Sequence, residues 1–405
     1  MSFDQFSIHP KCLDVLATQG LTEPTPVQSE AIPVALEGGD VIAVAQTGTG
    51  KTLAFSLPAL TRLAKGKRGR TRMLVLAPTR ELAQQVEKVI APLARPLGMK
   101  SVCIFGGVGM QPQTTALRRG TEIVIATPGR LLDHIGRGNV RFDALSILVL
   151  DEADRMLDMG FMPDMRRILA KLPSERQTLL FSATFPKEIQ RLTSDFQQNP
   201  QRIEVGVVSK PVETVEQALY TVNPNEKGML LSTVLDKPEV KSAIVFMRTK
   251  YRTDKVAKIL NKKGIKSQAI HGGRSQSQRD KALEQFRKGR CNVLVATDVA
   301  ARGIDISGVT HVINYDIPGS FDDYVHRIGR TGRANESGDA ITFVSPLEHK
   351  ELGAIEQSLG RNLPRTEWKG AVSVLSMFNP NGSKNRRRRP GGRSFRPRRR
   401  VAGAR

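Results

Sequence analysis

The sequence predicts an α/β protein of two tandem domains, each a mostly parallel sheet flanked by helices, followed by a disordered basic tail. Three observations support this fold class. The chain has 405 residues, too many for one ordinary core. Short Val/Ile/Leu-rich runs alternate with amphipathic helical stretches, and the same alternation returns in the second half. Because near-continuous apolar strands must be covered on both faces, the sheets should be parallel and buried.

The expected strands follow this alternation closely. In the first half they are 41–46, 73–78, 101–106, 122–127, 147–151 and 178–183, and in the second half 242–247, 267–272, 292–297, 311–316 and 339–344. The periodicity lapses near 206–214, where a proline appears. We therefore expect a first domain at 1–207, a linker at 208–216, a second domain at 217–370 and a disordered Arg-rich tail at 371–405.

The charge of the chain is strongly positive. Lys and Arg total 62 against 39 acidic residues, a net charge of +23, and residues 384–405 contain eleven basic residues and no acidic one. The remaining 23 − 11 = +12 belongs to residues 1–383. Both parts predict a polyanionic partner, although membrane surfaces and acidic proteins stay open on charge alone.

Other features of the composition predict a protein of the cytoplasm. No apolar run approaches the roughly 18 residues needed to cross a bilayer, and the first residues lack the basic and apolar regions of a secretion signal. The three cysteines are far apart and lack metal-ligand spacing, which argues against a disulfide framework or a zinc site.

The stretch "AQTGTGKT" (45–52) follows an expected strand and precedes an apolar helix. In that context glycines let the backbone N–H groups surround phosphates, while Lys51 reaches the β- and γ-phosphates and Thr52 offers its hydroxyl to magnesium. Ala45 stands where the general pattern has glycine, which is a small change. The alternative is an ordinary Gly-rich turn before a helix.

A second stretch, "LVLDEADRML" (148–157), runs from an apolar strand into three carboxylates. In phosphate-loop enzymes the acid that ends a second strand holds magnesium, and Asp151 fits that place. Glu152 can orient or deprotonate an attacking water. One magnesium ion and one water leave Asp154 without a role.

The stretch "HRIGRTGR" (326–333) places Arg327, Arg330 and Arg333 at three-residue spacing. Without acids between them these arginines would repel one another unless an anion binds there. A γ-phosphate is such an anion, and an arginine supplied to the transition state accelerates phosphoryl transfer by about 10³–10⁵. The alternative is a solvated basic surface.

Taken together, the motifs resemble those of the DEAD-box ATP-dependent RNA helicases, most closely the bacterial RhlE-type members. The resemblance covers 1–370 and rests on Phe3, "GLTEPTPVQ" (20–28), "AQTGTGKT", "PTREL" (78–82), "GG" (106–107), "TPGR" (127–130), "DEAD" (151–154), "SAT" (182–184), "IVF" (244–246), "ATDVAARGID" (296–305) and "HRIGRTGR". In this family Ala45 is the ordinary residue. The resemblance implies two tandem RecA-like P-loop domains and an RNA-stimulated ATPase that uses ATP and Mg²⁺.

The resemblance also implies the residues of the nucleotide site. Gln28 would bond the adenine edge with Phe3 nearby, Asp305 would contact the ribose, and Asp151 would hold Mg²⁺ with Thr52, through water. Catalysis would rest on Glu152, Lys51, Arg330 and Arg333. The remaining nucleotide-binding residues would be those of the loop, Thr47, Gly48, Thr49 and Gly50. Asp154 would couple hydrolysis to domain closure together with Ser182, Thr184 and His326.

RNA contacts implied by the resemblance use hydroxyls, arginines and exposed N–H groups, which bind phosphate and sugar without reading bases. They are Thr79, Arg80, Gly107, Thr127 and Arg130 in the first domain and Thr249, Thr297 and Arg302 in the second. Because only 5% of residues are aromatic, base stacking is not expected to be the main binding mode.

The expected partner is therefore RNA, bound with little base specificity, and short duplexes would be separated locally without translocation. The tail would tether RNA non-specifically, or dock ribosome-assembly or RNA-decay proteins. A monomer is the default expectation. Two rival functions stay open: a DNA-directed motor, and an RNA annealer or ATP-gated RNA clamp.

Overall fold

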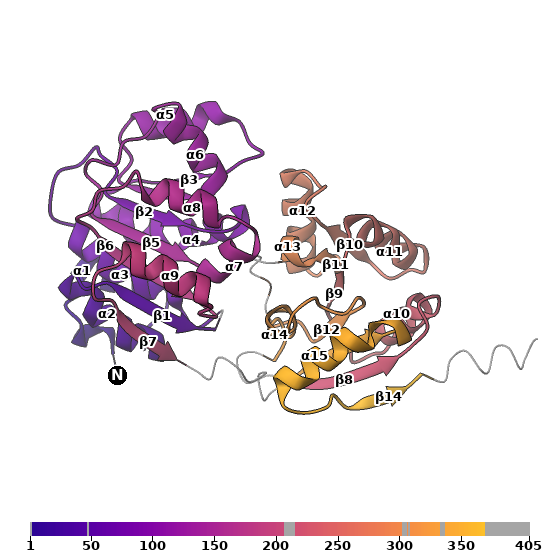
Figure 1. The fold of residues 1–405 in the computed structure, drawn as a ribbon. Coiled ribbons are helices and arrows are strands. Elements are labelled where there is room, and N and C mark those ends of the chain that lie inside the picture. The colour runs from indigo at the N-terminus through magenta and orange to yellow at the C-terminus, as the bar shows by residue number, and fades with distance from the viewer. Residues whose placement is uncertain are drawn as a thin grey trace, which may run out of the picture. The chain divides into compact units, whose positions relative to one another are not determined.

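The computed structural model describes residues 2–46, 48–205, 215–301, 306, 308–332 and 337–368 (Figure 1). Each half of this part of the chain contains one seven-stranded sheet, and every strand pair is parallel. The predicted fold class is confirmed. The predicted linker, 208–216, lies outside the described residues as far as 214, and the tail lies outside them from residue 369.

The first sheet has the order β3-β4-β2-β5-β6-β1-β7. Its strands are β1 Val41–Ala45, β2 Met73–Leu76, β3 Ser101–Ile104, β4 Ile123–Ala126, β5 Ile147–Asp151, β6 Gln177–Ser182 and β7 Gln201–Val205. The helices of this half are η1 Phe3–Gln5, α1 Pro10–Thr18, α2 Pro26–Glu37, α3 Lys51–Leu63, α4 Arg80–Ala94, η2 Arg95–Leu97, α5 Met110–Arg118, α6 Pro128–Gly136, α7 Ala153–Asp158, α8 Met162–Leu169 and α9 Lys187–Phe196.

The second sheet has the order β10-β11-β9-β12-β13-β8-β14. Its strands are β8 Val215–Thr221, β9 Ala243–Met247, β10 Ser267–Ile270, β11 Val293–Thr297, β12 His311–Asn314, β13 Gly338–Val344 and β14 Arg365–Glu367. The helices are α10 Lys227–Leu235, α11 Lys250–Lys262, α12 Gln276–Arg287, α13 Asp298–Ala301, α14 Phe321–Ile328, η3 Pro346–Glu348 and α15 His349–Leu359. Numbered from the first strand of each half, the two sheets have the same strand order.

Side chains of the first sheet alternate between two apolar cores. Ala43 of β1 and Val75 of β2 pack with the helices of one face, α1 to α4. Val44 and Leu74, each one residue away, pack with α6 to α9 on the other. Successive strand residues point to opposite faces, so strands covered on both sides must be apolar throughout. This burial explains the continuous Val/Ile/Leu runs of the sequence.

All of the predicted strands are present, with ends that differ by a few residues at most. Three further strands, β7, β8 and β14, were not predicted. In β7 only the middle residue is buried, and β8 alternates buried and partly exposed residues. These strands lie at or beside a sheet edge. Their polar positions interrupt the continuous apolar run on which the prediction depended.

Buried polar groups fix the chain where β1 begins. Asp40 accepts hydrogen bonds from the backbone N–H of Thr178 at 2.6 Å and of Gln198 at 2.7 Å. The Gln177 side chain donates to the carbonyls of Ala35 at 2.9 Å and Gly39 at 2.7 Å. These bonds hold the start of β6 and the segment before β7 against β1.

None of the helices in the described residues is long and apolar enough to span a membrane.

Replacement of Asp40 by alanine is expected to lower the free energy of unfolding by about 1–3 kcal/mol, because two buried N–H groups lose their acceptor. Urea unfolding of the full chain measures the change. Asp14→Ala, which removes an exposed carboxylate from α1, is the matched control and should change it by less than about 0.5 kcal/mol. Equal losses in both variants would contradict the assigned role of Asp40.

Candidate functional site

The phosphate-loop segment lies between β1 and α3. Gly48 and Gly50 have φ of 91° and 88°, a left-handed backbone that favours glycine. Lys51 is the first residue of α3 and donates from Nζ to the Ala45 carbonyl at 2.6 Å. Burial lowers the pKa of Lys51, and the carboxylates of Glu152, Asp151 and Asp154 act in the opposite direction. The loop thus places one buried cation at the N-terminus of a helix, where anions are favoured. Thr47 lies outside the described residues.

The start of α2 braces this loop. Gln28 accepts from the Thr25 N–H at 2.9 Å and donates to the Gly50 carbonyl at 3.0 Å, and the Thr25 hydroxyl donates to the Thr49 carbonyl at 2.7 Å. A Cβ on Gly50 would lie 2.3 Å from the Gln28 amide nitrogen and would displace that side chain, and the φ of 88° separately favours glycine there. Phe3 is buried in the apolar core that also contains residues of α2 and α3. The adenine contacts expected of Gln28 and Phe3 stay predictions.

The carboxylates of the "DEAD" segment lie at the carboxyl end of β5. Asp151 is the last residue of the strand, and Glu152 has φ 52° and ψ 53°, a left-handed backbone that is uncommon for a residue with a side chain. Burial, and then the charge of Glu152, raise the pKa of Asp151 to about 7. A strained backbone at one residue and a raised carboxyl pKa at its neighbour are together typical of a functional site.

Arg155 completes this cluster, and the sequence interpretation missed it. Its side chain is 2% exposed and its Nη1 lies 2.8 Å from Glu152 Oε2. The ion pair orients the Glu152 carboxylate from within the same short helix, α7. The sequence contains a signal for this pair, because an arginine three residues after a glutamate lies on the same face of a helix.

Asp154 binds the segment that follows β6. Its carboxylate accepts from the Ala183 N–H at 3.1 Å, the Thr184 N–H at 2.8 Å and the Thr184 hydroxyl at 3.0 Å. Ser182 Oγ accepts from the Asp154 N–H at 3.2 Å. Burial raises the pKa of Asp154, but the charge of His326, with Lys51, Arg155 and the Thr184 N–H, outweighs it and lowers that pKa. Hydrogen bonds therefore join Asp154, Ser182 and Thr184 of the predicted coupling group, and His326 acts on Asp154 through its charge.

The five RNA-contact candidates of the first half gather at the carboxyl ends of β2, β3 and β4. Thr79 precedes α4 and Thr127 precedes α6. Gly107 has φ 79°, and a Cβ there would lie 2.2 Å from an Arg80 Nη atom. Arg130 donates to the Val108 carbonyl at 3.2 Å. A cavity of about 270 Å³ is lined by four of them, Thr79, Arg80, Thr127 and Arg130, among others.

In the second half, Thr249 precedes α11 and accepts from the Arg252 N–H at 3.4 Å, and Thr297 ends β11. Arg330 follows α14 and is buried. Three predicted site residues, Arg302, Asp305 and Arg333, lie outside the described residues.

The prediction that the three spaced arginines meet one external anion is wrong for Arg327. This side chain lies on α14 and forms two bonds to the Asp298 carboxylate, at 2.6 and 2.7 Å. It also donates to Asn314 Oδ1 at 3.1 Å and to the Asp316 carbonyl at 2.7 Å. Its anion is therefore internal, supplied by a residue 29 positions earlier in the chain, which local spacing does not reveal.

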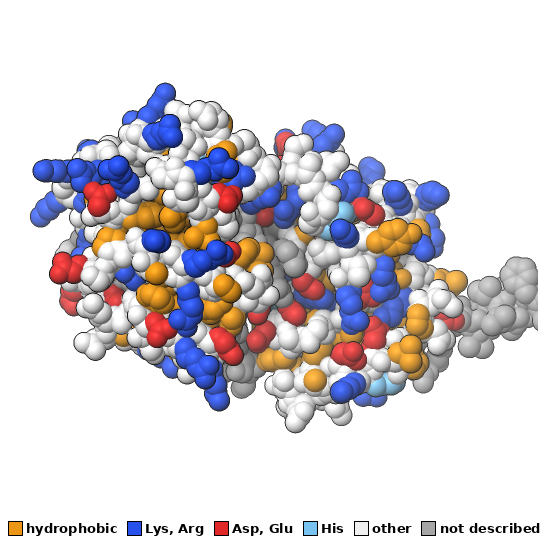
Figure 2. Space-filling model, turned by 45° about the horizontal axis from the view of Figure 1, so that its top comes forward, with side chains coloured by type: hydrophobic (Ala, Val, Ile, Leu, Met, Phe, Trp, Pro, Cys, Tyr) orange, Lys and Arg blue, Asp and Glu red, His pale blue; other side chains and the backbone are white. Residues whose placement is uncertain are grey.

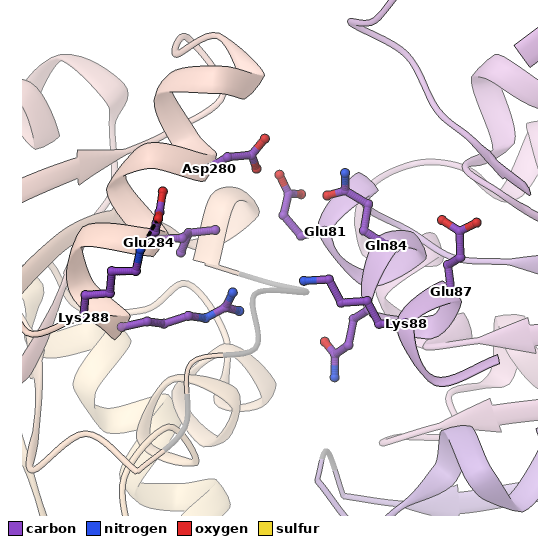
Figure 3. Close-up of a pocket in the computed structure, with 10 residues that line it drawn as sticks. Glu81, Gln84, Glu87, Lys88, Asp280, Glu284 and Lys288 are labelled. Carbon is purple, nitrogen blue, oxygen red and sulfur yellow. Dashed lines mark hydrogen bonds and ion pairs between the residues drawn. The ribbon is translucent and has the colours of Figure 1, made fainter. Parts of the chain in front are cut away.

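A second missed group surrounds Glu81 of the "PTREL" segment. Arg279 Nη2 lies 2.8 Å from its carboxylate, and Gln276 donates to it at 3.2 Å. Side chains of α4 and α12 line a neighbouring cavity of about 580 Å³, where both acidic and basic groups project (Figure 3). The sequence did contain a signal for this pair. Glu81 lies among residues assigned to phosphate binding, but a carboxylate cannot bind phosphate, so a basic partner within the protein was to be expected.

Comparison with known proteins decides the family. The DEAD/DEAH box helicase model matches residues 25–192, and the helicase conserved C-terminal domain matches 226–335. The chain is 44% identical over 361 residues to the ATP-dependent RNA helicase CshA of Listeria monocytogenes, which covers 89% of this chain and 69% of that one. It is 43% identical over 365 residues to the DEAD-box ATP-dependent RNA helicase CshA of Bacillus subtilis, covering 90% and 74%. The chain belongs to the DEAD/DEAH box helicase family.

Solved structures of DEAD-box helicases agree with the fold. S. cerevisiae Dbp5 bound to RNA and ADP BeF3 has a TM-score of 0.83 at 31% identity, covering 93% of this chain and 98% of that one. A DEAD box protein from the hyperthermophile Methanococcus jannaschii has a TM-score of 0.52 at 37% identity, covering 91% and 99%. The RhlE-type subtype stays a prediction.

Arg155→Met in this helicase is expected to lower the free energy of unfolding by about 3–5 kcal/mol, because it leaves the buried Glu152 carboxylate without its ion-pair partner. Urea unfolding measures it. The control, Arg167→Met, breaks a pair of the same spacing with Asp164 on the surface of α8, which should cost less than about 1 kcal/mol. Comparable losses of unfolding free energy in the two variants would show that the Arg155–Glu152 pair contributes no more to stability than a surface pair.

Proposed function

We propose that this helicase binds ATP, Mg²⁺ and the backbone of RNA, and that hydrolysis is coupled to local separation of short RNA duplexes. One observation carries the proposal. The buried cluster of Lys51, Asp151, Glu152 and Arg155 lies at the carboxyl edge of the same sheet as the loops that carry Thr79, Arg80 and Thr127. In parallel α/β sheets ligands bind outside the carboxyl ends of the strands.

ATP would be held by the phosphate loop. Backbone N–H groups between Gly48 and Lys51 would surround the phosphates, and the buried Lys51 ammonium would exchange the Ala45 carbonyl for a phosphate oxygen. Gln28 and Phe3 would recognise the adenine, and Asp305 would contact the ribose. Since Gln28 already bonds the Gly50 carbonyl, its side chain would link base recognition to the shape of the phosphate loop.

Magnesium fits the donor set at this site. Thr52 offers a hydroxyl on the first turn of α3, and Asp151 offers a carboxylate, in part through water. Burial and repulsion from Glu152 raise the pKa of Asp151 to about 7, a repulsion that a divalent cation relieves. In the described residues no group of three His, Cys, Asp or Glu could hold a metal. That fits Mg²⁺, which binds through one or two carboxylates plus substrate phosphates. The bound ion would neutralise phosphate charge.

Hydrolysis would use Glu152 as the base. Its carboxylate would accept a proton from water as the water oxygen bonds to the γ-phosphorus and the bond from that phosphorus to the bridging oxygen of ADP breaks. Arg155 bonds Glu152 Oε2 and so fixes the direction of the carboxylate. Arg330 and Arg333 of the second half would stabilise the charge on the transferred phosphoryl group.

Coupling would pass through the segment after β6. Asp154 bonds the backbone and hydroxyl of Thr184, and His326 lowers the pKa of Asp154 through its charge. ATP and RNA together would close the two halves, bend one strand and expel its partner, and product release would reopen them. Such a cycle separates short duplexes without translocation.

RNA would be bound through phosphates and sugars, with little base specificity. The contacts would come from Thr79, Arg80, Gly107, Thr127 and Arg130 in the first half and Thr249, Thr297 and Arg302 in the second. The Arg-rich tail would add non-specific affinity by counterion release, or would dock ribosome-assembly or RNA-decay proteins. We place the protein, as a monomer, in the cytoplasm, where RNA and ATP occur together.

Glu152→Gln is expected to lower the kcat of RNA-stimulated ATP hydrolysis at least about 100-fold, because the amide cannot accept the proton. Affinity for ATP and RNA should change little. Glu175→Gln removes an exposed carboxylate elsewhere in the first half and should hydrolyse ATP like the natural chain. Normal hydrolysis by Glu152→Gln would refute the role of Glu152 as base.

A further inference from the structure

A dense group of basic side chains lies away from the site described above. Loop 64–72, "AKGKRGRTR", contains five basic residues and no acidic one. Basic residues at the end of α5, before β3 and after α6 join it. We call this group the basic edge. Its exposed members are Lys65, Lys67, Arg68, Arg70, Lys100, Arg118, Arg119, Arg137 and Arg141.

Hydrogen bonds hold these segments together as one surface. Glu122 accepts from the backbone N–H of Gly69 at 2.8 Å and of Lys100 at 2.9 Å. Arg118 donates to Asn139 at 3.1 Å. A Cβ on Gly120 would lie 2.1 Å from the Gly69 carbonyl oxygen, so the two turns are in direct contact. The basic edge is therefore a built surface, with its loop fixed against the turn that precedes β4.

The acids of these segments do little to neutralise the surface. Glu122 is 4% exposed, and both of its oxygens accept backbone N–H groups. Asp143 is exposed and pairs with Arg70 at 3.0 Å. Among the described residues, Lys67, Arg119 and Arg141 form no ion pair with any carboxylate. Lys and Arg side chains accordingly gather at the upper left of the view in Figure 2, with acidic side chains sparse among them.

The basic edge lies at the opposite end of the strands from the nucleotide and RNA loops. Its segments directly precede β2, β3 and β4, or follow α6 on the way to β5. All of these strands are parallel, so their amino ends form one edge of the sheet. With strands of four or five residues at about 3.3 Å each, the two edges are separated by roughly 15 Å of sheet alone.

The chemistry of the surface favours a polyphosphate backbone. Like charges held together repel, and the pKa of Arg72 is lowered by burial and by the charge of Arg68. A membrane surface is disfavoured, because the exposed large hydrophobic residues among those described all lie elsewhere. The one aromatic residue of these segments, Phe142, is buried, so no aromatic side chain is exposed there to stack on bases. Such a surface binds phosphates in series, without reading sequence.

We propose that the basic edge is a second RNA-binding surface, which holds the backbone of the duplex or folded RNA that flanks the strand bound at the carboxyl edge. The proposal rests on RNA being the substrate of this helicase. A structured RNA would contact both edges of the first half at once, and the second contact would raise affinity for structured RNA over an isolated strand.

The test uses a triple variant of the full chain, Lys67→Gln, Arg119→Gln and Arg141→Gln, with one substitution in each of three segments. None of these side chains makes a hydrogen bond or ion pair within the described residues, so the fold should persist. The matched control, Lys171→Gln, Lys187→Gln and Arg191→Gln, removes the same charge from exposed positions around α8 and α9.

Two RNA probes distinguish binding at the basic edge from binding at the carboxyl edge. One is a single strand of about ten nucleotides, long enough for one strand site. The other carries the same strand as an overhang on a duplex of about 16 base pairs. For the edge variant we expect about tenfold weaker binding of the overhang duplex, and a salt slope shallower by about 2 to 3. Binding of the single strand and the ATP hydrolysis it stimulates should match those of the natural chain and the control.

Three results would overturn the proposal. Equal affinity of the edge variant and the control for the overhang duplex would mean that the surface does not contact RNA. Equal loss for both probes would mean a general effect of charge. Loss of binding only to anionic phospholipid vesicles would make the surface a membrane contact. If the natural chain binds neither RNA probe, the proposed function itself fails, which is a distinct outcome.

Discussion

The buried group of charges at the ends of β1 and β5 is the constraint on which the rest of the site depends. Two cations, Lys51 and Arg155, face three carboxylates, those of Asp151, Glu152 and Asp154. All five side chains are buried, where an uncompensated charge costs far more than in water. The group therefore carries one negative charge in excess, and burial together with the charge of Glu152 raises the pKa of Asp151 to about 7. A divalent metal ion supplies the missing positive charge, so the site suits a ligand that arrives with such an ion.

The topology of the sheet makes this group possible. Strand β6 lies between β5 and β1, so the segment after β6 sits between the phosphate loop and the acids. This position is why Asp154 can bond Thr184 while its neighbours serve the nucleotide. Because the strands are parallel, all of their carboxyl ends lie at one edge of the first sheet and all of their amino ends at the other. The carboxyl edge carries the nucleotide and RNA loops, and the amino edge carries the basic side chains of the basic edge.

The sequence could predict whatever depended on local pattern. Continuous apolar runs identified the strands buried on both faces, and the Gly-rich loop and paired acids identified the nucleotide site. Long-range partners could not be predicted this way. Arg327 is neutralised by Asp298, far back in the chain, and the edge strands β7 and β14 depend on pairing that local apolarity does not report. The basic edge was hidden for the same reason, because strand order, not spacing, brings its segments together.

Steady-state ATP hydrolysis by the full chain shows whether the buried charges act on ATP only when RNA occupies the loops at the same edge. It should be measured without nucleic acid, with single-stranded RNA and with DNA of matched sequence. We expect strong stimulation by RNA and little by DNA. Equal stimulation by DNA would contradict RNA-specific coupling and indicate a general nucleic-acid motor. Hydrolysis unchanged by either would contradict the coupling assigned to Asp154 and His326.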